Sequence, residues 1–253
     1  MECFIVEPAD LNQESKTLVL RDEEAHHAFK SLRLRPGDSL LATNLIGTCY
    51  ECKLESIEDR IATCSIENVL HHYGEPKRHV TLIQGTISSP ARWEFLLEKA
   101  TELGVKVVQP VVTERSERFR PKIERMERLL RAAVKQTKRS NKPWLRLATT
   151  DAAGKGMSSE LSSLREALSE AVRERCKLLL LHETAPQESS LWNLPAHLGN
   201  MPIAIAVGPE GGFSDAEVRM AQEEFGAAVV SLGTRRLRAE TAAIAALAIV
   251  IDH

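Results

Sequence analysis

The chain has 253 residues, of which 43% are hydrophobic and 27% are charged, and its net charge is −2. This composition is typical of a globular protein with an ordinary core, and the length suits one large domain or two of average size. A membrane-spanning protein is excluded, because no apolar run approaches the roughly 18 residues of a transmembrane helix. The five irregularly spaced cysteines and the absence of a signal-like first segment predict a reduced, cytoplasmic protein.

The first 72 residues predict a small β-rich domain. Short runs with rough alternation and many Thr, Ile, Val, Tyr or Cys residues predict strands at 39–43, 48–54 and 61–66. A short helix is expected over 22–32, and several strands at such close spacing favour a small barrel. Residues 73–76, Tyr-Gly-Glu-Pro, have the composition of a linker.

Three cysteines of this region, with two following histidines, raise the question of a zinc site. Cys49, Cys52 and Cys64 lie in strand-like runs, however, and no second Cys-x-x-Cys pair accompanies them. We therefore predict buried thiols and no metal.

From residue 76 onward the pattern alternates between strands and helices. The apolar runs are continuous, as expected for parallel strands buried on both faces. Strands are predicted at 79–84, 105–112, 177–182, 202–207 and 227–232. Helices are predicted at 90–103, 123–138, 158–175, 214–225 and 241–251, and Ser214 with Glu217 matches a capping box. Residues 76–253 therefore predict an α/β domain with a parallel sheet.

A basic block lies between Glu114 and Arg146. It holds 12 Lys or Arg against 4 Asp or Glu, a local net charge of +8, which leaves about −10 for the rest of the chain. Such a block indicates an anion-facing surface, for example one for nucleic acid, and the alternative is a solvated helix face with excess charge.

Two glycine-bearing segments near the C-terminus are the most informative motifs. They are Val207–Ser214 (VGPEGGFS) and Leu232–Thr241 (LGTRRLRAET). Each follows an apolar run and leads into a helix, and loops at the carboxyl ends of strands are where α/β proteins place ligands. We therefore expect one shared pocket. Neither segment is a dinucleotide or phosphate-loop fingerprint. The alternatives are a tight turn for the first, and salt bridges of its arginines to Glu210, Glu240 or a partner subunit for the second.

Read together, these two segments resemble the SPOUT superfamily of methyltransferases, and most closely the bacterial 16S ribosomal RNA uridine-N3 methyltransferases. Three further blocks support the resemblance, which extends over nearly the whole chain: Leu32–Asp38, Glu98–Gly104 and Ala133–Ser140. Two departures lie on the side expected to contact RNA. Residues 85–92 read Gly-Thr-Ile-Ser-Ser-Pro-Ala-Arg where the family has a Lys-Gly-(Asp/Glu) turn, and residues 136–139 read Gln-Thr-Lys-Arg where it has Gln-Ser-Gly-Arg.

The resemblance implies a C-terminal α/β trefoil-knot domain over 76–253 and an N-terminal PUA-like β-barrel over 1–72 that binds RNA. It implies an enzyme that methylates N3 of a uridine in small-subunit ribosomal RNA, free or in the assembled subunit, and that forms a homodimer through C-terminal helices. The alternatives are methylation of another RNA, such as the ribose of transfer RNA, and a non-catalytic RNA-binding module. The cofactor implied is S-adenosyl-L-methionine, bound by three loops with the residues Leu181, His182, Glu183, Gly208, Pro209, Glu210, Gly211, Gly212, Leu232, Gly233, Leu237 and Arg238.

Within such an enzyme the chemistry suggests roles for three side chains. Methyl transfer is a direct displacement, so alignment is the main task, and the proton on N3 must also be removed. Arg238 is expected to stabilise negative charge on the base, and Glu210 or Glu240 to accept the proton. Phosphate contacts are expected from Lys30, Arg33, Arg35, Arg115, Lys138 and Arg139.

Overall fold

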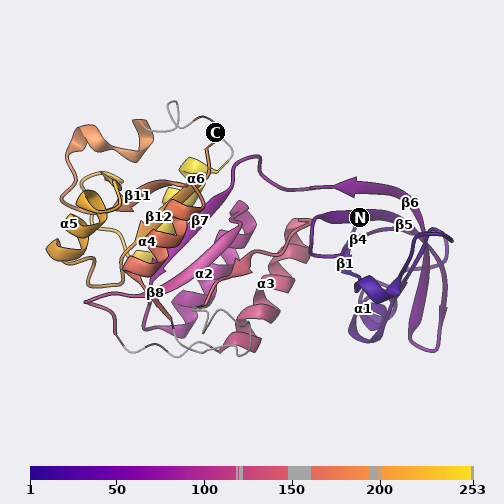
Figure 1. Cartoon of the computed structure of the whole chain (residues 1–253). Coiled ribbons are helices and arrows are strands. Elements are labelled where there is room, and N and C mark those ends of the chain that lie inside the picture. The colour runs from indigo at the N-terminus through magenta and orange to yellow at the C-terminus, as the bar shows by residue number, and fades with distance from the viewer. Residues whose placement is uncertain (118, 120–121, 148–160, 194–198, 200, 252–253) are drawn as a thin grey trace, which may run out of the picture. The chain divides into compact units, whose positions relative to one another are not determined.

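The computed structural model describes residues 1–117, 119, 122–147, 161–193, 199 and 201–251 (Figure 1). It divides into two compact units. The first contains Met1–Glu75 and Arg131–Lys142, and the second contains Pro76–Leu130 and Pro143–His253. Helix α3 (Ile123–Thr137) therefore contributes residues to both units.

The first unit is built on a six-stranded sheet with the order β1-β4-β5-β6-β3-β2. Strands β1 and β4 run parallel and the other neighbours run antiparallel. The predicted helix at 22–32 is confirmed as helix α1, Asp22–His26, continued by a π-helical turn, His27–Ser31. A short 3-10 turn spans Pro8–Asp10. The strands are β1 Cys3–Ile5, β2 Leu11–Asn12, β3 Thr17–Leu20, β4 Ser39–Thr43, β5 Thr48–Glu58 and β6 Ile61–His71.

The cysteines of this unit face its interior. Cys49, Cys52 and Cys64 are buried, and burial raises the pKa of the Cys49 thiol to about 11 and that of the Cys64 thiol to about 12. Cys52 and Cys64 pack with Leu18, Leu40 and other apolar side chains of the core. The predicted burial of these thiols is confirmed.

The second unit contains a seven-stranded sheet in which every recorded pairing is parallel, as predicted. The strand order is β10-β8-β7-β12-β11-β13, and β9 also pairs with β8. The strands are β7 Val80–Gly85, β8 Val107–Val112, β9 Trp144–Leu145, β10 Ser162–Ser163, β11 Lys177–Leu181, β12 Ile203–Val207 and β13 Ala228–Val230.

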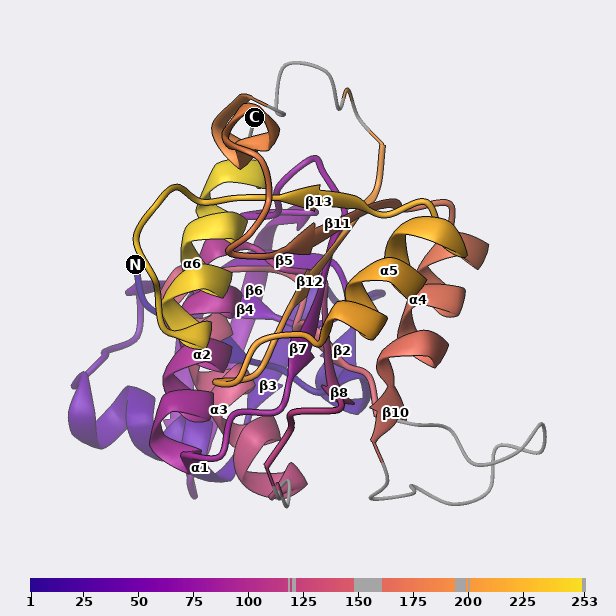
Figure 2. The same cartoon turned by 90° about the vertical axis from the view of Figure 1, so that its left-hand side faces the viewer.

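Helices cover both faces of this sheet (Figure 2). Side chains alternate along the central strands, so Leu82 and Ile205 pack toward α2 and α6, whereas Ile83 and Ala206 pack toward α4 and α5. The helices are α2 Pro90–Leu103, α4 Leu164–Arg173, α5 Asp215–Glu223 and α6 Ala239–Val250, with short 3-10 turns at Gln187–Ser189 and Leu191–Asn193.

Local side-chain chemistry fixes two of the helix starts. The Ser214 hydroxyl accepts from the N–H of Glu217, whose carboxylate accepts from the N–H of Ser214, so the predicted capping box is confirmed. The helix predicted from 158 begins instead at Leu164, because Ser163 and Glu166 form a second capping box there. Residues 158–160 lie outside the described residues.

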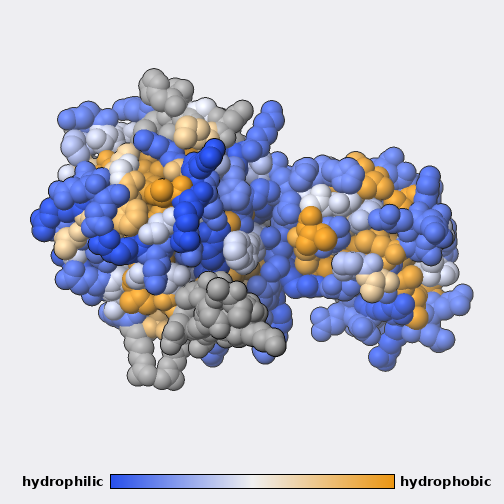
Figure 3. Space-filling model, viewed as in Figure 1, coloured by the Kyte–Doolittle hydropathy of each residue, from blue (hydrophilic) through white to orange (hydrophobic). Residues whose placement is uncertain are grey.

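Among the described residues, no helix is long and apolar enough to cross a membrane. The face of each unit that Figure 3 shows is mostly hydrophilic, with separate hydrophobic patches. Scattered apolar residues of this kind are normal on a protein surface.

Candidate active site

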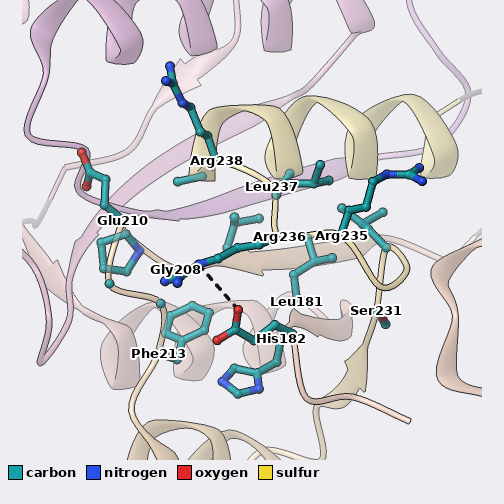
Figure 4. A pocket seen from close by; sticks show the side chains of 18 of the residues that line it. Leu181, His182, Gly208, Glu210, Phe213, Ser231, Arg235, Arg236, Leu237 and Arg238 are labelled. Carbon is teal, nitrogen blue, oxygen red and sulfur yellow. Dashed lines mark ion pairs between the residues drawn. The ribbon is translucent and has the colours of Figure 1, made fainter. Parts of the chain in front are cut away.

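A cavity of about 680 Å³ lies at the carboxyl ends of three neighbouring strands, β12, β11 and β13 (Figure 4). Its walls come from the loops that follow these strands and from the start of α6. The structure thus brings together the two glycine-bearing segments as one shared pocket. Every residue predicted to bind a cofactor lines it: Leu181, His182, Glu183, Gly208, Pro209, Glu210, Gly211, Gly212, Leu232, Gly233, Leu237 and Arg238.

The loop after β12 is a tight turn made possible by its glycines. The N–H of Gly212 donates to the carbonyl of Pro209 at 2.9 Å, and Gly212 has a φ of +69°. A Cβ on Gly208 would lie 3.0 Å from the backbone of Gly212. The prediction of a tight turn and the prediction of a pocket wall therefore describe the same segment.

Two neighbouring segments hold this loop in place. On one side, the side-chain amide of Gln84 donates to the carbonyls of Gly208 and Val207, at 3.2 and 3.4 Å. On the other, Arg115 Nη1 donates to the carbonyl of Gly211 at 3.0 Å. Gly85 adds a close approach of chain to chain, since a Cβ there would lie 2.5 Å from the nitrogen of Pro209. The loop is therefore positioned by backbone contacts from distant parts of the sequence.

The loop after β13 presents three arginines at the pocket. Gly233 has a φ of +111°, and its N–H donates to the Ser231 hydroxyl at 3.0 Å. Arg236 Nε lies 3.7 Å from Glu183 Oε2, the ion pair drawn in Figure 4. Both side chains are mostly exposed, so this pair contributes little to stability. Among the described residues, Arg235 and Arg238 form no ion pair, so the alternative of salt bridges to Glu210 or Glu240 is wrong for this loop.

The two predicted catalytic carboxylates lie on either side of an arginine that the sequence motifs did not indicate. Glu210 Oε1 accepts from the N–H and the hydroxyl of Ser88, at 3.1 and 3.0 Å. Arg92 Nη2 lies 3.6 Å from Glu210 Oε1, and its Nη1 lies 4.0 Å from Oε2 of the buried Glu240. Arg92 and Glu210 line the pocket, whereas Glu240 does not. The sequence feature that could have drawn attention to Arg92 is its position in the segment 85–92, which differs from the family pattern.

The residues predicted to contact phosphate lie in different settings. Lys30, Arg33 and Arg35 are exposed in the first unit, within and just after the π-helical turn, and Lys138 is half-buried there. Arg115 is exposed at the pocket of the second unit.

The structure corrects the prediction that Arg139 contacts phosphate. Its side chain and that of Glu75 are each only 2% exposed, and its Nη2 donates to Glu75 Oε2 at 2.8 Å. The guanidinium is a buried structural group, so it is not available to phosphate.

The basic block is also less cationic than its sequence indicates. Acidic residues from outside the block pair with many of its bases, and these pairs are Arg125–Glu94, Arg131–Glu7, Lys135–Glu24, Arg139–Glu75 and Arg146–Glu174. The excess charge therefore serves in part to join segments of the protein, which neither of the two interpretations of the block anticipated.

Comparisons with known proteins match both units. Residues 74–251 match the family described as RNA methyltransferase domain, and residues 20–67 match the RNA methyltransferase PUA domain. The chain is 24% identical to ribosomal RNA small subunit methyltransferase E of Bacillus subtilis (strain 168), over 94% of this chain and 91% of that protein. It is 30% identical to the protein of the same name from Synechocystis sp., over 92% of this chain and 72% of the relative.

Solved structures show the same likeness. The crystal structure of a ribosomal RNA small subunit methyltransferase E from Neisseria gonorrhoeae bound to S-adenosyl methionine is 29% identical, with a TM-score of 0.75, and covers 98% of this chain and 95% of that one. A Legionella pneumophila methyltransferase with bound cofactor SAM is 26% identical, with a TM-score of 0.76, and covers 99% and 96%.

These likenesses confirm the predicted fold class: a C-terminal α/β trefoil-knot domain of the SPOUT type with a parallel sheet, preceded by a PUA-like β-domain. Because the matched domain extends over most of the sequence, this chain belongs to the RNA methyltransferase family.

Proposed function

We propose that this protein transfers a methyl group from S-adenosylmethionine to N3 of a uridine in small-subunit ribosomal RNA. The observation that carries the proposal is the shared pocket at the ends of β11, β12 and β13, made of the glycine-bearing loops. Relatives of 29% and 26% identity hold S-adenosylmethionine in their solved structures, and the named relatives are small-subunit ribosomal RNA methyltransferases.

The residues of the pocket fit this cofactor. A cavity of about 680 Å³ lies within the usual range for small-molecule sites. Leu181, Leu232 and Leu237 offer apolar walls, while the glycine-rich backbone offers N–H and C=O groups suited to an adenine edge. The carboxylates of Glu183 and Glu210 complement a sulfonium, which carries positive charge and supplies the activated methyl group.

The reaction requires the protein to remove the N3 proton and to stabilise the negative charge that develops on the base. Uridine N3 carries a hydrogen at neutral pH, so a positioned base must take it as the new N3–C bond forms. Glu210 or Glu240 is the acceptor, and Arg238, the N-cap residue of α6, offsets the negative charge that develops on the base. The rigid loops align the reacting atoms, which is the largest contribution available to a displacement of this kind.

The first unit holds the RNA in this proposal. Lys30, Arg33 and Arg35 offer exposed cations to phosphate, and Lys138 of the same unit adds a further contact. Arg115 adds a phosphate contact from the second unit. Arg139 takes no part. A ribosomal substrate implies that the protein acts in the cytoplasm. A homodimer that packs through the outer face of α6 is part of the proposal, and light scattering of the purified protein checks it.

The decisive experiment follows the methyl group. The protein is incubated with labelled S-adenosylmethionine and unmodified small ribosomal subunits or total RNA, and the RNA is digested to nucleosides. Label in 3-methyluridine is the expected result. Label in a ribose-methylated nucleoside would instead favour the transfer RNA alternative, and RNA binding without any transfer would favour a non-catalytic module.

An exposed aromatic residue provides a test of the RNA-holding role. Phe29 is 51% exposed in the π-helical turn, with Lys30 Nζ 5.3 Å from its ring centre. Stacking of a base on such a ring contributes about 1–3 kcal/mol. Phe29→Ala is therefore expected to weaken RNA binding by a factor of about 5 to 150, as measured by fluorescence anisotropy with a fragment of 16S ribosomal RNA.

Phe95 is the matched control. It is 49% exposed, with Lys99 Nζ 5.8 Å from its ring centre, but Lys99 is paired with Glu98 and Glu102. Acidic surroundings repel RNA, so Phe95→Ala should leave RNA affinity unchanged. Equal losses for the two variants would show that Phe29 has no specific part in RNA binding.

A further inference from the structure

Arg92 occupies a position between two carboxylates that come from different parts of the fold. It lies in the first turn of α2, Glu210 lies in the loop after β12, and Glu240 lies in the first turn of α6. Its two terminal nitrogens face different acids, at 3.6 Å from Glu210 Oε1 and at 4.0 Å from Glu240 Oε2. The single guanidinium of Arg92 therefore lies between two carboxylates, and the three side chains together have a formal charge of −1.

The two carboxylates differ in their surroundings. Glu240 is 5% exposed, and its Oε2 has no hydrogen-bond partner in the described part of the chain. A buried carboxylate in this state depends on a nearby charge, and Arg92 supplies it. Glu240 lies outside the lining of the pocket, so it faces the arginine rather than a ligand.

Glu210 is held at one oxygen and open at the other. Its Oε1 accepts hydrogen bonds from the backbone N–H and the hydroxyl of Ser88, and it also faces Arg92. No described residue forms a hydrogen bond with its Oε2, and the residue lines the pocket. A carboxylate fixed by one oxygen presents the other in a defined direction, which is the requirement for a general base.

We propose that Arg92 is a positioning residue of the methyl-transfer site, oriented by Glu240 and in turn orienting Glu210, which accepts the N3 proton. This inference rests on the proposed function and assigns its base. The N3–C bond forms as the C–S bond of the methyl donor breaks, with that electron pair passing to sulfur. The N3 proton passes to Oε2 of Glu210. Glu240 acts only through Arg92.

The test compares four variants at saturating substrate, with cofactor affinity measured separately by calorimetry. Glu210→Gln is expected to lower kcat by about 100-fold or more, as for loss of a general base. Arg92→Gln is expected to lower kcat by about tenfold or more, with less than about a threefold change in cofactor affinity, and Arg92→Lys should recover part of the loss. Glu240→Gln should lower kcat less than Arg92→Gln does.

Rescue by the conservative variant distinguishes positioning from simple packing. A positive charge can still face the two carboxylates in Arg92→Lys but not in Arg92→Gln, so kcat should recover in part in the lysine variant alone, while the cofactor affinity stays the same in both. Arg125→Gln is the matched control. It removes an exposed ion pair with Glu94 outside the pocket and should leave both kcat and the cofactor affinity unchanged.

Three results would overturn the inference. A loss in Glu240→Gln as large as that in Glu210→Gln would make Glu240 the base. A fall in cofactor affinity alone in Arg92→Gln would make Arg92 part of the pocket wall. Wild-type kinetics in Arg92→Gln would show that Arg92 has no part in the reaction. Failure of the proposed function is separate, since wild-type protein would then transfer no methyl group to uridine N3.

Discussion

Replacing Gly85 with alanine is expected to abolish cofactor binding and to destabilise the second unit by about 3 kcal/mol or more. The added Cβ would lie 2.5 Å from the nitrogen of Pro209, 2.6 Å from its Cδ and 2.9 Å from the carbonyl carbon of Gly208. These are backbone and ring atoms with no rotamer to change, so the loop itself must move. Overpacking of this kind costs about 1–3 kcal/mol even among side chains, and the displaced loop is a wall of the pocket.

Gly226→Ala separates this steric effect from the general cost of replacing a glycine. Gly226 has a φ of +66°, and a Cβ added there would meet no atom within 4 Å, so alanine is strained by about 1–2 kcal/mol without a clash. Its cofactor affinity should match that of the wild type. Calorimetry with S-adenosylmethionine and thermal unfolding measure the two effects, and wild-type affinity in Gly85→Ala would contradict the role given to this contact.

Removing the carboxylate of Glu75 is expected to destabilise the first unit by about 3–5 kcal/mol. The carboxylate of Glu75 accepts three hydrogen bonds. Two come from Nε and Nη2 of Arg139, at 3.2 and 2.8 Å, and one comes from the backbone N–H of Asn141, at 2.9 Å. Both charged side chains are almost completely buried. In Glu75→Ala the guanidinium of Arg139 stays buried after losing the carboxylate of Glu75, and the loss of one partner is the costly case for a buried pair.

Hydrogen exchange of the β4 and β5 amides measures this loss in the first unit alone. The double variant Glu75→Met with Arg139→Met should recover much of the stability, because apolar side chains of similar size remove both charges. The control is Glu67→Ala, which breaks an exposed pair with Lys53 in the same unit and should cost less than about 1 kcal/mol. Equal losses of stability in Glu75→Ala and Glu67→Ala would show that the buried pair contributes no more than an exposed one.

The parts of the fold that follow from neighbouring residues could be predicted from the sequence. The capping box of Ser214 and Glu217 is a contact over three residues, and the burial of β7, β11 and β12 follows from their continuous apolar runs. The pocket could be anticipated too, because strand ends followed by glycine-rich turns gather at one edge of a parallel sheet.

Contacts between distant segments could not be predicted. Arg139 has the same charge and neighbourhood as an RNA-binding residue, and only its meeting with Glu75 shows that it is buried. Arg92 lies in a stretch without a recognisable motif, and its importance depends on Glu210 and Glu240, which arrive from elsewhere in the fold. A pairwise charge contact leaves no periodic signal in the sequence.

The origin of the pocket walls has a consequence for synthesis on the ribosome. The first unit is complete once residue 142 has left the exit tunnel, whereas the pocket waits for the loop after β13 and the start of α6. Domains fold in the order in which they emerge. The nascent chain therefore passes through an interval in which its first unit is folded and its methyl-donor pocket does not yet exist, so modification is deferred until the start of α6 has been synthesised.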